Sequence, residues 1–256
     1  MSFPDHFSRD PQSYCRYRPR YPEPLFDYLA SVAPARALAV DCATGNGQAA
    51  AGLVSRFDRV LGLDASPNQV VQATAAGAAR GSRAALPARF AVALAEALPL
   101  RAECVDLLTV AQAAHWLEFD RFYAEVRRVV RPGGVVALWS YPLFEVDEAI
   151  DREVRRFVDG IVGGHWPPQR SHIDADYQTI PFPFPELETP RVEMTADWGL
   201  DRLVGYMGTW SAVLRYRRAT GDDPLPALRS ALARRWGEGR ERRVRWALAL
   251  RVGRVG

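Results

Sequence analysis

The chain has 256 residues, and its 33 basic side chains are all arginine because the sequence contains no lysine. This absence excludes Schiff-base catalysis, a lysine general base and the phosphate-binding lysine of a P-loop, since each of them needs a side-chain amine. The 30 acidic residues leave a net charge of +3, and 48% hydrophobic with 25% charged residues is typical of a globular protein.

The first half of the chain alternates strands with helices. Pro22 to Ala33 has the apolar spacing of a helix. The predicted elements that follow are strand Ala37–Asp41, helix Gln48–Phe57, strand Val60–Asp64, helix Ser66–Ala76, strand Arg89–Val92, strand Val105–Val110, helix Glu118–Val130 and strand Val135–Tyr141. Because each strand is apolar on both faces, the pattern predicts a doubly wound α/β fold with a parallel sheet covered on both sides.

The alternation stops beyond Pro142. Asp147 to Val162 is expected to be helical, and Gly163 to Pro190 is expected to be a long loop rich in proline and aromatic residues. The elements predicted after it are a strand at Val192–Trp198, helices at Leu200–Arg217 and Pro224–Trp236, and a final strand at Arg243–Gly253. The second half therefore does not continue the regular alternation of strands and helices.

The turn after the first predicted strand has the composition of a nucleotide-binding loop. In Asp41-Cys-Ala-Thr-Gly-Asn-Gly47, the small residues Ala43, Gly45 and Gly47 let the backbone approach a ligand at the carboxyl ends of the strands. Asp64 ends the next strand, where a carboxylate can accept hydrogen bonds from both hydroxyls of an adenosine ribose. A tight structural turn, with Asp64 as a helix cap, is the alternative interpretation.

Two cofactors are compatible with this loop. Gly45-Asn-Gly-Gln-Ala-Ala50 also fits the G-x-G-x-x-A of a dinucleotide fold, so a nicotinamide-dependent oxidoreductase is an alternative function. A pyrophosphate favours positive potential at the helix N-terminus, whereas the ammonium and sulfonium groups of S-adenosylmethionine favour an acid there. Asp41 is such an acid, and electrostatics therefore favours S-adenosylmethionine.

Five segments carry a resemblance to a known family. They are Ala39–Gln48, Gly62–Ser66, Ala95–Pro99, Asp106–Gln112 with His115-Trp116, and Val130–Gly134. In this order and spacing they resemble the class I S-adenosylmethionine-dependent methyltransferases. Tyr17–Pro22 and Tyr206–Ser211 resemble the small-molecule branch that includes trans-aconitate methyltransferase-like proteins. The resemblance implies a Rossmann-like, mostly parallel sheet of seven strands whose last two form an antiparallel edge, together with an N-terminal helix and a lid insertion.

The resemblance also implies the residues that hold S-adenosylmethionine. The expected contacts are Asp41, Ala43, Gly45 and Gly47 around the methionine portion, Asp64 at the ribose, Ala65, Ala95 and Glu96 at the adenine, Ala111 and Gln112 at the amino group, and Arg18 at the carboxylate. The family usually has glycine where Ala43 stands, so the added methyl group is expected to narrow this part of the site.

Methyl transfer from a sulfonium is an in-line displacement, so the enzyme mainly aligns the accepting atom and excludes water. A base is needed only where the acceptor must lose a proton, and the candidate is His115, just beyond the fourth strand. A histidine that packs or contacts substrate is the alternative. The acceptor is expected to be the carboxylate or hydroxyl of an organic acid or secondary metabolite, contacted by Tyr14, Tyr17, Tyr21, Trp116 and Trp210.

Segments outside the predicted sheet are expected to close over the acceptor. Tyr14–Tyr21, Trp166–Phe184 and Tyr206–Arg218 are rich in aromatic residues and arginine, which suit a sulfonium and a carboxylate respectively. We expect one methyltransferase domain over residues 1–256. It consists of an N-terminal cap segment (1–35), a cofactor-binding core (36–141), a lid insertion (142–190), and C-terminal helices and edge strands (191–256).

Arginine is concentrated near the C-terminus. Residues 215–256 contain 12 arginines against 4 acids, a net charge of +8, whereas residues 1–214 have a net charge of −5. A basic face of this kind would suit a non-catalytic module that binds nucleic acid or S-adenosylmethionine, which is a third alternative. We expect a solvated face instead, with a small-molecule acceptor as partner, no nucleic acid or membrane, and a monomer or homodimer.

The cysteines and the N-terminus indicate the compartment. Cys15, Cys42 and Cys104 are odd in number and widely spaced, which argues against a disulfide framework and a zinc site. Residues 1–10 do not have the basic and apolar run of a signal peptide, and no stretch approaches the ~18 apolar residues of a membrane span. We therefore expect a soluble, unprocessed, cytoplasmic protein without a metal site.

Overall fold

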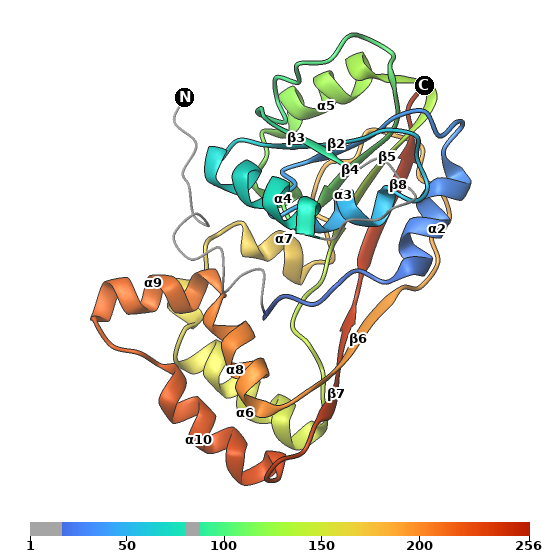
Figure 1. Ribbon diagram of the computed structural model, residues 1–256. Coiled ribbons are helices and arrows are strands. Elements are labelled where there is room, and N and C mark those ends of the chain that lie inside the picture. The colour runs from blue at the N-terminus through green and yellow to red at the C-terminus, as the bar shows by residue number, and fades with distance from the viewer. Residues whose placement is uncertain (1–16, 80–87) are drawn as a thin grey trace.

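A computed structural model of the chain describes residues 17–79 and 88–256 (Figure 1). Tyr14, predicted to contact the acceptor, lies outside the described residues. The described strands are β1 (Ala39–Cys42), β2 (Val60–Asp64), β3 (Arg89–Val92), β4 (Val105–Ala111), β5 (Val130–Ser140), β6 (Glu193–Trp198), β7 (Arg242–Ala247) and β8 (Ala249–Arg254). The described helices are α2 (Glu23–Val32), α3 (Gln48–Leu53), α4 (Pro67–Ala79), α5 (Phe119–Val129), α6 (Glu148–Gly160), α7 (Arg170–Asp174), α8 (Leu200–Gly208), α9 (Ser211–Thr220) and α10 (Leu225–Trp236), with short 3₁₀ helices η1 (Ala114–Trp116) and η2 (Gly163–His165).

The main sheet has the strand order β3-β2-β1-β4-β5-β8. Strands β1 to β5 are parallel, and Ala39 of β1 lies opposite Val60 of β2 and Leu107 of β4. Strand β8 runs antiparallel to β5 at the edge. The predicted doubly wound α/β fold, mostly parallel with an antiparallel edge strand, is thereby confirmed.

Within the described residues this sheet has six strands rather than the predicted seven. The predicted final strand divides at Leu248, whose backbone N–H donates to the carbonyl of Val192 at 2.9 Å. Strand β8 extends the sheet as far as Ser140, the last residue of β5, which pairs with Ala249. Strand β7 runs beyond that end of β5 and pairs instead with β6 in a separate antiparallel ribbon.

Apolar side chains cover both faces of the main sheet. On one face the sheet packs against Phe122 and Val126 of α5, and on the other against Phe26 of α2 and Leu53 of α3. Burying one such side chain contributes about 1.5–3 kcal/mol. The 3.6-residue spacing that predicted these helices therefore also identifies the faces that they bury.

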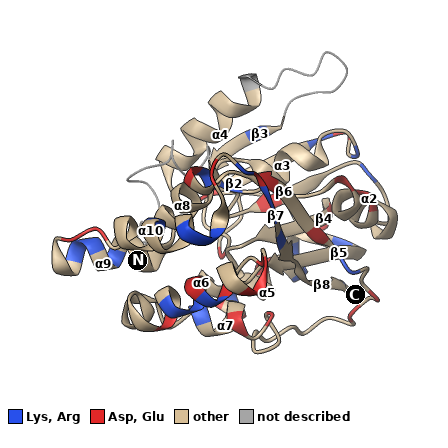
Figure 2. Cartoon of the chain, turned by 90° about the horizontal axis from the view of Figure 1, so that it is seen from below, with Lys and Arg blue, Asp and Glu red and all other residues tan. Residues whose placement is uncertain are grey.

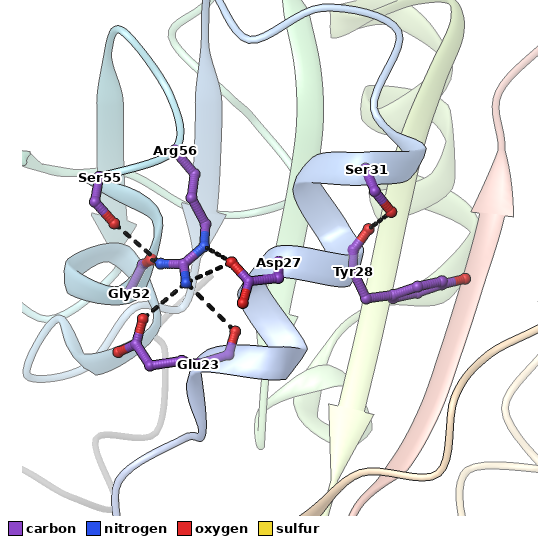
Figure 3. Close-up of polar contacts among 7 residues, drawn as sticks. All are labelled: Glu23, Asp27, Tyr28, Ser31, Gly52, Ser55 and Arg56. Atoms are coloured by element: carbon purple, nitrogen blue, oxygen red, sulfur yellow. Dashed lines mark hydrogen bonds and ion pairs between the residues drawn. The ribbon is translucent and has the colours of Figure 1, made fainter.

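Arg56 joins α2 to the end of α3 (Figure 3). Its guanidinium forms ion pairs at 2.7 Å with Glu23 and Asp27, and it donates a hydrogen bond to the carbonyl of Gly52 at 2.9 Å. Because α2 follows directly on segment 17–22, this junction helps to hold that segment beside the loop between β1 and α3.

Helices α6, α8, α9 and α10 gather beyond the carboxyl ends of the parallel strands, around the β6–β7 ribbon (Figure 1). Their common core includes Trp198 of β6, Trp236 of α10 and Trp246 of β7. The single helix predicted over residues 200–217 is two helices in the structure. Trp210 separates them because its backbone is extended, with φ −71° and ψ 139°.

The segment expected to be a long loop, residues 163–190, contains η2 and α7 and is anchored to the sheet. Arg251 of β8 donates hydrogen bonds to the carbonyls of Tyr177 at 3.0 Å and Ile180 at 2.7 Å, and it pairs with Glu186 at 2.5 Å. The hydroxyl of Tyr123 on α5 donates to the carbonyl of Pro181 at 2.5 Å. Buried donors therefore fix residues 177–186 in one conformation.

The C-terminal arginines lie among acidic residues from other segments. In Figure 2, acidic and basic segments alternate along α6, and an acidic turn adjoins the basic end of α9. The ion pairs with acids of other segments are Arg229–Asp201, Arg235–Glu153, Arg242–Asp147, Arg243–Asp197 and Arg251–Glu186, and Arg217 pairs with Asp223 of the same segment. This arrangement neutralises much of the charge of the basic segment.

Within the part of the chain that the structure describes, no helix combines the length and hydrophobicity that crossing a membrane requires. The same residues contain no group of three or more histidine, cysteine, aspartate or glutamate side chains placed to hold a metal ion.

Candidate active site

The loop between β1 and α3 forms the floor of a crevice at the carboxyl ends of the strands. Ala43, Gly45 and Gly47 have φ values of 50°, 54° and 78°, in the left-handed region that glycine adopts most easily. A Cβ atom added to Gly45 would meet nothing within 4 Å, so the crevice is open above it. A Cβ atom on Gly47 would lie 2.8 Å from the ring of Phe90, so Gly47 is needed for packing.

The carboxylate of Asp41 lies under this loop and is 1% exposed. It accepts hydrogen bonds from the hydroxyls of Thr44 at 2.6 Å and Thr109 at 2.7 Å. Burial raises the pKa of the Asp41 carboxyl to about 6, against these hydrogen bonds, which lower it. Asp41 thus joins β1 to β4 and supports the loop from below, and the contact with the methionine portion that the resemblance implies stays a prediction.

Asp64 is the last residue of β2, and its carboxylate binds the backbone of the loop between β1 and α3. Its Oδ2 accepts the backbone N–H of Gly45 at 2.8 Å, and its Oδ1 accepts that of Ser66 at 2.9 Å. A carboxylate has about four acceptor positions and can accept several hydrogen bonds at once. Asp64 therefore fixes the position of Gly45 and remains a suitable ribose contact.

The predicted adenine contacts lie on the neighbouring elements. Ala65 follows Asp64 and is partly exposed, whereas Ala95 is buried. A carboxylate oxygen of Glu96 accepts the backbone N–H of Glu118 at 3.0 Å, directly before α5. Glu96 therefore also has a structural function at the start of that helix.

The residues that line the crevice were predicted from the sequence to bind different ligands. Arg18, Ala43, Gly45 and Ala111, predicted to bind cofactor, line it together with Tyr21, predicted to bind acceptor. The residues not predicted are Thr44, Asn46, Gln48, Ala49 and Tyr141. We call this set the cofactor crevice. Its small residues and the open space above Gly45 leave room for a nucleoside that carries an amino-acid group.

A second pocket adjoins the cofactor crevice, and we call it the acceptor pocket. Arg18 and Tyr141 line both. Its other lining residues are Gln112, His115, Trp116, Pro142, Leu143, Trp166, Pro167, Arg170, Ile173, Tyr206, Trp210 and Ser211. The predicted His115, Trp116 and Trp210 are therefore brought together here, and Gln112, predicted to bind cofactor, belongs to this lining.

Gln112 and Arg18 shape the boundary between the two sites. Gln112 has a left-handed backbone with φ 56°, and its side-chain amide donates to the carbonyl of Tyr141 at 3.1 Å. The guanidinium of Arg18 lies 5.3 Å from the centre of the Tyr206 ring, a cation–π distance. Tyr17, predicted to contact the acceptor, is not among the lining residues and instead packs against Gly205 of α8.

His115 is held by η1 at the end of β4 and is 6% exposed. Its Nδ1 lies 2.9 Å from the hydroxyl of Tyr177. Burial lowers the pKa of His115 to about 3, with smaller contributions from His172 and Arg170. The ring is therefore neutral at physiological pH.

Several of these lining residues could have been predicted as ligand contacts from their positions in the sequence. Tyr141 directly follows β5, at the same sheet edge as Asp41 and Asp64, and could have been found by its position. Trp166, Arg170 and Tyr206 were expected only as parts of the lid. Ser211 lies in the predicted lid and in the segment Tyr206–Ser211 that resembles the small-molecule branch, but it was not named as a contact.

Comparison with known proteins supplies the family. The family model described as "Methyltransferase domain" matches residues 40–138. A Dictyostelium discoideum protein provisionally named a methyltransferase is 30% identical over 234 residues, which cover 90% of this chain and 86% of that protein. An uncharacterized methyltransferase from Mycobacterium tuberculosis is 34% identical over 185 residues, which cover 72% of this chain and 67% of that protein.

A solved structure agrees with these relatives. A protein of Anaeromyxobacter dehalogenans, provisionally described as a type II methyltransferase, is 45% identical and superposes with a TM-score of 0.83, covering 93% of this chain and 98% of its own. These similarities decide between the functions that the sequence left open and do not support the oxidoreductase. The chain therefore belongs to the class I S-adenosylmethionine-dependent methyltransferase family.

Proposed function

We propose that this enzyme methylates a carboxylate of a small organic acid in the acceptor pocket. The observation that carries the proposal is the composition of that pocket. It offers the guanidinium of Arg170, which also pairs with Asp174 at 2.7 Å, among aromatic and apolar side chains, and Arg18 lies at its boundary with the cofactor crevice. The described lining contains no carboxylate or thiol. Arginine is suited to bind a carboxylate, and a hydroxyl acceptor would need a base that this lining supplies poorly.

Residues of the cofactor crevice would hold S-adenosylmethionine, which supplies an electrophilic methyl group when bound. Asp64 would accept hydrogen bonds from the ribose, and Arg18 would pair with the carboxylate of the methionine portion. Ala43, Gly45 and Ala111 would admit the ligand through their small size, and Ala65, Ala95 and Glu96 would border the adenine. Asp41 would act through the loop, with its buried charge favouring the ammonium and sulfonium groups nearby.

The acceptor pocket would then align the reacting oxygen and exclude water. Trp116, Trp166 and Trp210 supply apolar walls, and Arg170 stacks over Trp166 with 4.4 Å to the ring centre. The carboxylate oxygen forms the new bond to the methyl carbon as the bond from carbon to sulfur breaks. The products are a methyl ester and S-adenosylhomocysteine, and no proton needs to be removed.

The test is transfer from isotopically labelled S-adenosylmethionine to acceptors in a metabolite extract. Label should enter small acids and be released as methanol by mild alkali, because alkali cleaves methyl esters and leaves methyl ethers intact. Arg170→Met should reduce this labelling without weakening S-adenosylhomocysteine binding. Alkali-stable label would instead support a hydroxyl acceptor, and an absence of labelled small molecules with a cofactor-binding enzyme would contradict the proposal.

A further inference from the structure

The pair formed by His115 and Tyr177 joins the acceptor pocket to the segment after α7. His115 lines the pocket from η1, and Tyr177 lies behind it, 0% exposed. The distance from His115 Nδ1 to Tyr177 Oη is 2.9 Å, and the ring centres are 5.9 Å apart. Nδ1 of His115 is thus hydrogen-bonded to a buried partner, and Nε2 is the ring nitrogen that can contact a ligand.

The direction of this hydrogen bond follows from the surroundings of the hydroxyl. Burial raises the pKa of Tyr177, so the phenol keeps its proton. Among the described contacts, the only hydrogen-bond partner of the Tyr177 hydroxyl is Nδ1 of His115, so the hydrogen of this buried phenol has no other acceptor. The phenol hydrogen is therefore directed to Nδ1. A neutral imidazole that accepts at Nδ1 carries its own hydrogen on Nε2.

The backbone at Tyr177 is strained in a way that fits a positioning function. Asp176 and Tyr177 have φ values of 50° and 60°, in the left-handed region that is rare for bulky residues. A non-glycine residue keeps this strained conformation only where its surroundings enforce it. The hydrogen bond of 3.0 Å from Arg251 to the carbonyl of Tyr177 helps to maintain this backbone conformation.

We propose that Tyr177 is a positioning residue that holds His115 as a fixed hydrogen-bond donor to the methyl acceptor. In this arrangement Tyr177 donates to Nδ1, and Nε2–H faces the acceptor's oxygen. His115 is then not a general base. The functional part of this inference rests on the proposed methylation of a carboxylate, whereas the tautomer of His115 can be measured without any acceptor.

The charged groups around His115 favour this neutral form. Arg170 and His172 of α7 lie near the ring, and Arg18 lies across the acceptor pocket. The other ionisable groups of the lining are the phenols of Tyr141 and Tyr206. Since no described acid lines this pocket, nothing there favours a protonated imidazolium.

Nuclear magnetic resonance of protein labelled with ¹⁵N-histidine tests the tautomer. The chain contains four histidines, so the spectrum of His115→Gln identifies the signals of His115. We expect a protonated Nε2, an accepting Nδ1 and no titration between about pH 5.5 and 8. A hydrogen on Nδ1, or titration within this range, would overturn the inference.

Tyr177→Phe removes the hydroxyl and should allow both tautomers of His115 or make the ring titrate. The matched control is Tyr123→Phe, which also removes a buried hydroxyl that anchors the same segment, here at Pro181. Both variants should lose comparable stability, but only Tyr177→Phe should change the His115 signals. If Tyr177→Phe does not fold, the tautomer of His115 in the wild-type spectrum still tests the inference.

Substitutions of His115 separate a donor from a base. The side-chain amide of glutamine can replace an Nε2–H donor but cannot accept a proton, so His115→Gln should keep at least tenfold more labelling activity than His115→Ala. Equal loss in both variants, with a rate that rises with pH around neutrality, would establish a base. If labelling fails altogether while the tautomer is as expected, the methylation proposal fails and the Tyr177–His115 pairing stands.

Discussion

The guanidinium of Arg18 donates a hydrogen bond of 3.2 Å to the hydroxyl of Tyr141, and these two residues line both the cofactor crevice and the acceptor pocket. The two residues are far apart in the sequence, since Arg18 precedes α2 and Tyr141 follows β5. A change in one of them should therefore affect the binding of cofactor and acceptor together.

Arg18→Met should weaken S-adenosylhomocysteine binding about 10-fold or more, because a hydrogen bond to a charged group contributes about 1.5–3 kcal/mol. Tyr141→Phe should have a smaller effect, since the arginine remains. Calorimetric titration measures both. Arg36→Met, at an exposed arginine, is the control and should bind like wild type. Unchanged affinity in Arg18→Met would show that this arginine does not contact the cofactor.

Ala43→Gly should stabilise the protein. The φ of 50° at Ala43 costs a non-glycine residue about 1 kcal/mol, so glycine should raise the free energy of unfolding by about 0.5–1 kcal/mol. Ala51→Gly in α3 is the matched control and should lower it by a similar amount. Urea unfolding measures both, and a loss of stability in Ala43→Gly would contradict the strain argument.

Asp41→Asn should change how stability depends on pH. Because burial raises the pKa of Asp41 to about 6, the protonated form is favoured in the folded state. Wild type should therefore lose stability relative to Asp41→Asn as the pH rises from about 4 to about 6, by on the order of 3 kcal/mol. Urea unfolding at several pH values measures this difference. A constant difference across that range would exclude the raised pKa.

Arg251→Met should destabilise the protein by about 2–3 kcal/mol, because it leaves two buried carbonyls and Glu186 without their donor. Hydrogen exchange should also show faster opening of residues 177–186. The control is Arg243→Met, which breaks an exposed pair with Asp197 and should leave the free energy of unfolding almost unchanged. Equal effects of the two variants would show that Arg251 does not anchor the segment.

Local patterns were sufficient to predict the parallel core. Strand β2 has the predicted bounds, and α2, α4, α5 and α10 differ from their predictions by a few residues, because period and capping are properties of adjacent residues. The division of the final strand was not predictable in this way. It depends on where β5 ends at Ser140, which is a property of another segment.

The site shows the same distinction between local and tertiary information. Asp64, Gly45 and His115 could be proposed from the sequence because Asp64 ends a predicted strand and the other two lie four and five residues beyond the ends of predicted strands. The interaction of Asp41 with Thr109, and that of His115 with Tyr177, join residues 68 and 62 positions apart and carry no signature in either segment. The sequence therefore indicated Asp41 as a cofactor residue but not its buried hydrogen bonds to the neighbouring elements.

The most direct test of the account is calorimetric titration of the protein with S-adenosylhomocysteine. We predict one-to-one binding for wild type, at least a tenfold loss of affinity, about 1.4 kcal/mol, in Asp64→Asn, and no loss in the exposed control Asp58→Asn. Failure of wild type to bind at near-millimolar ligand, or equal affinity of the Asp64→Asn variant and wild type, would contradict the assignment of the cofactor crevice.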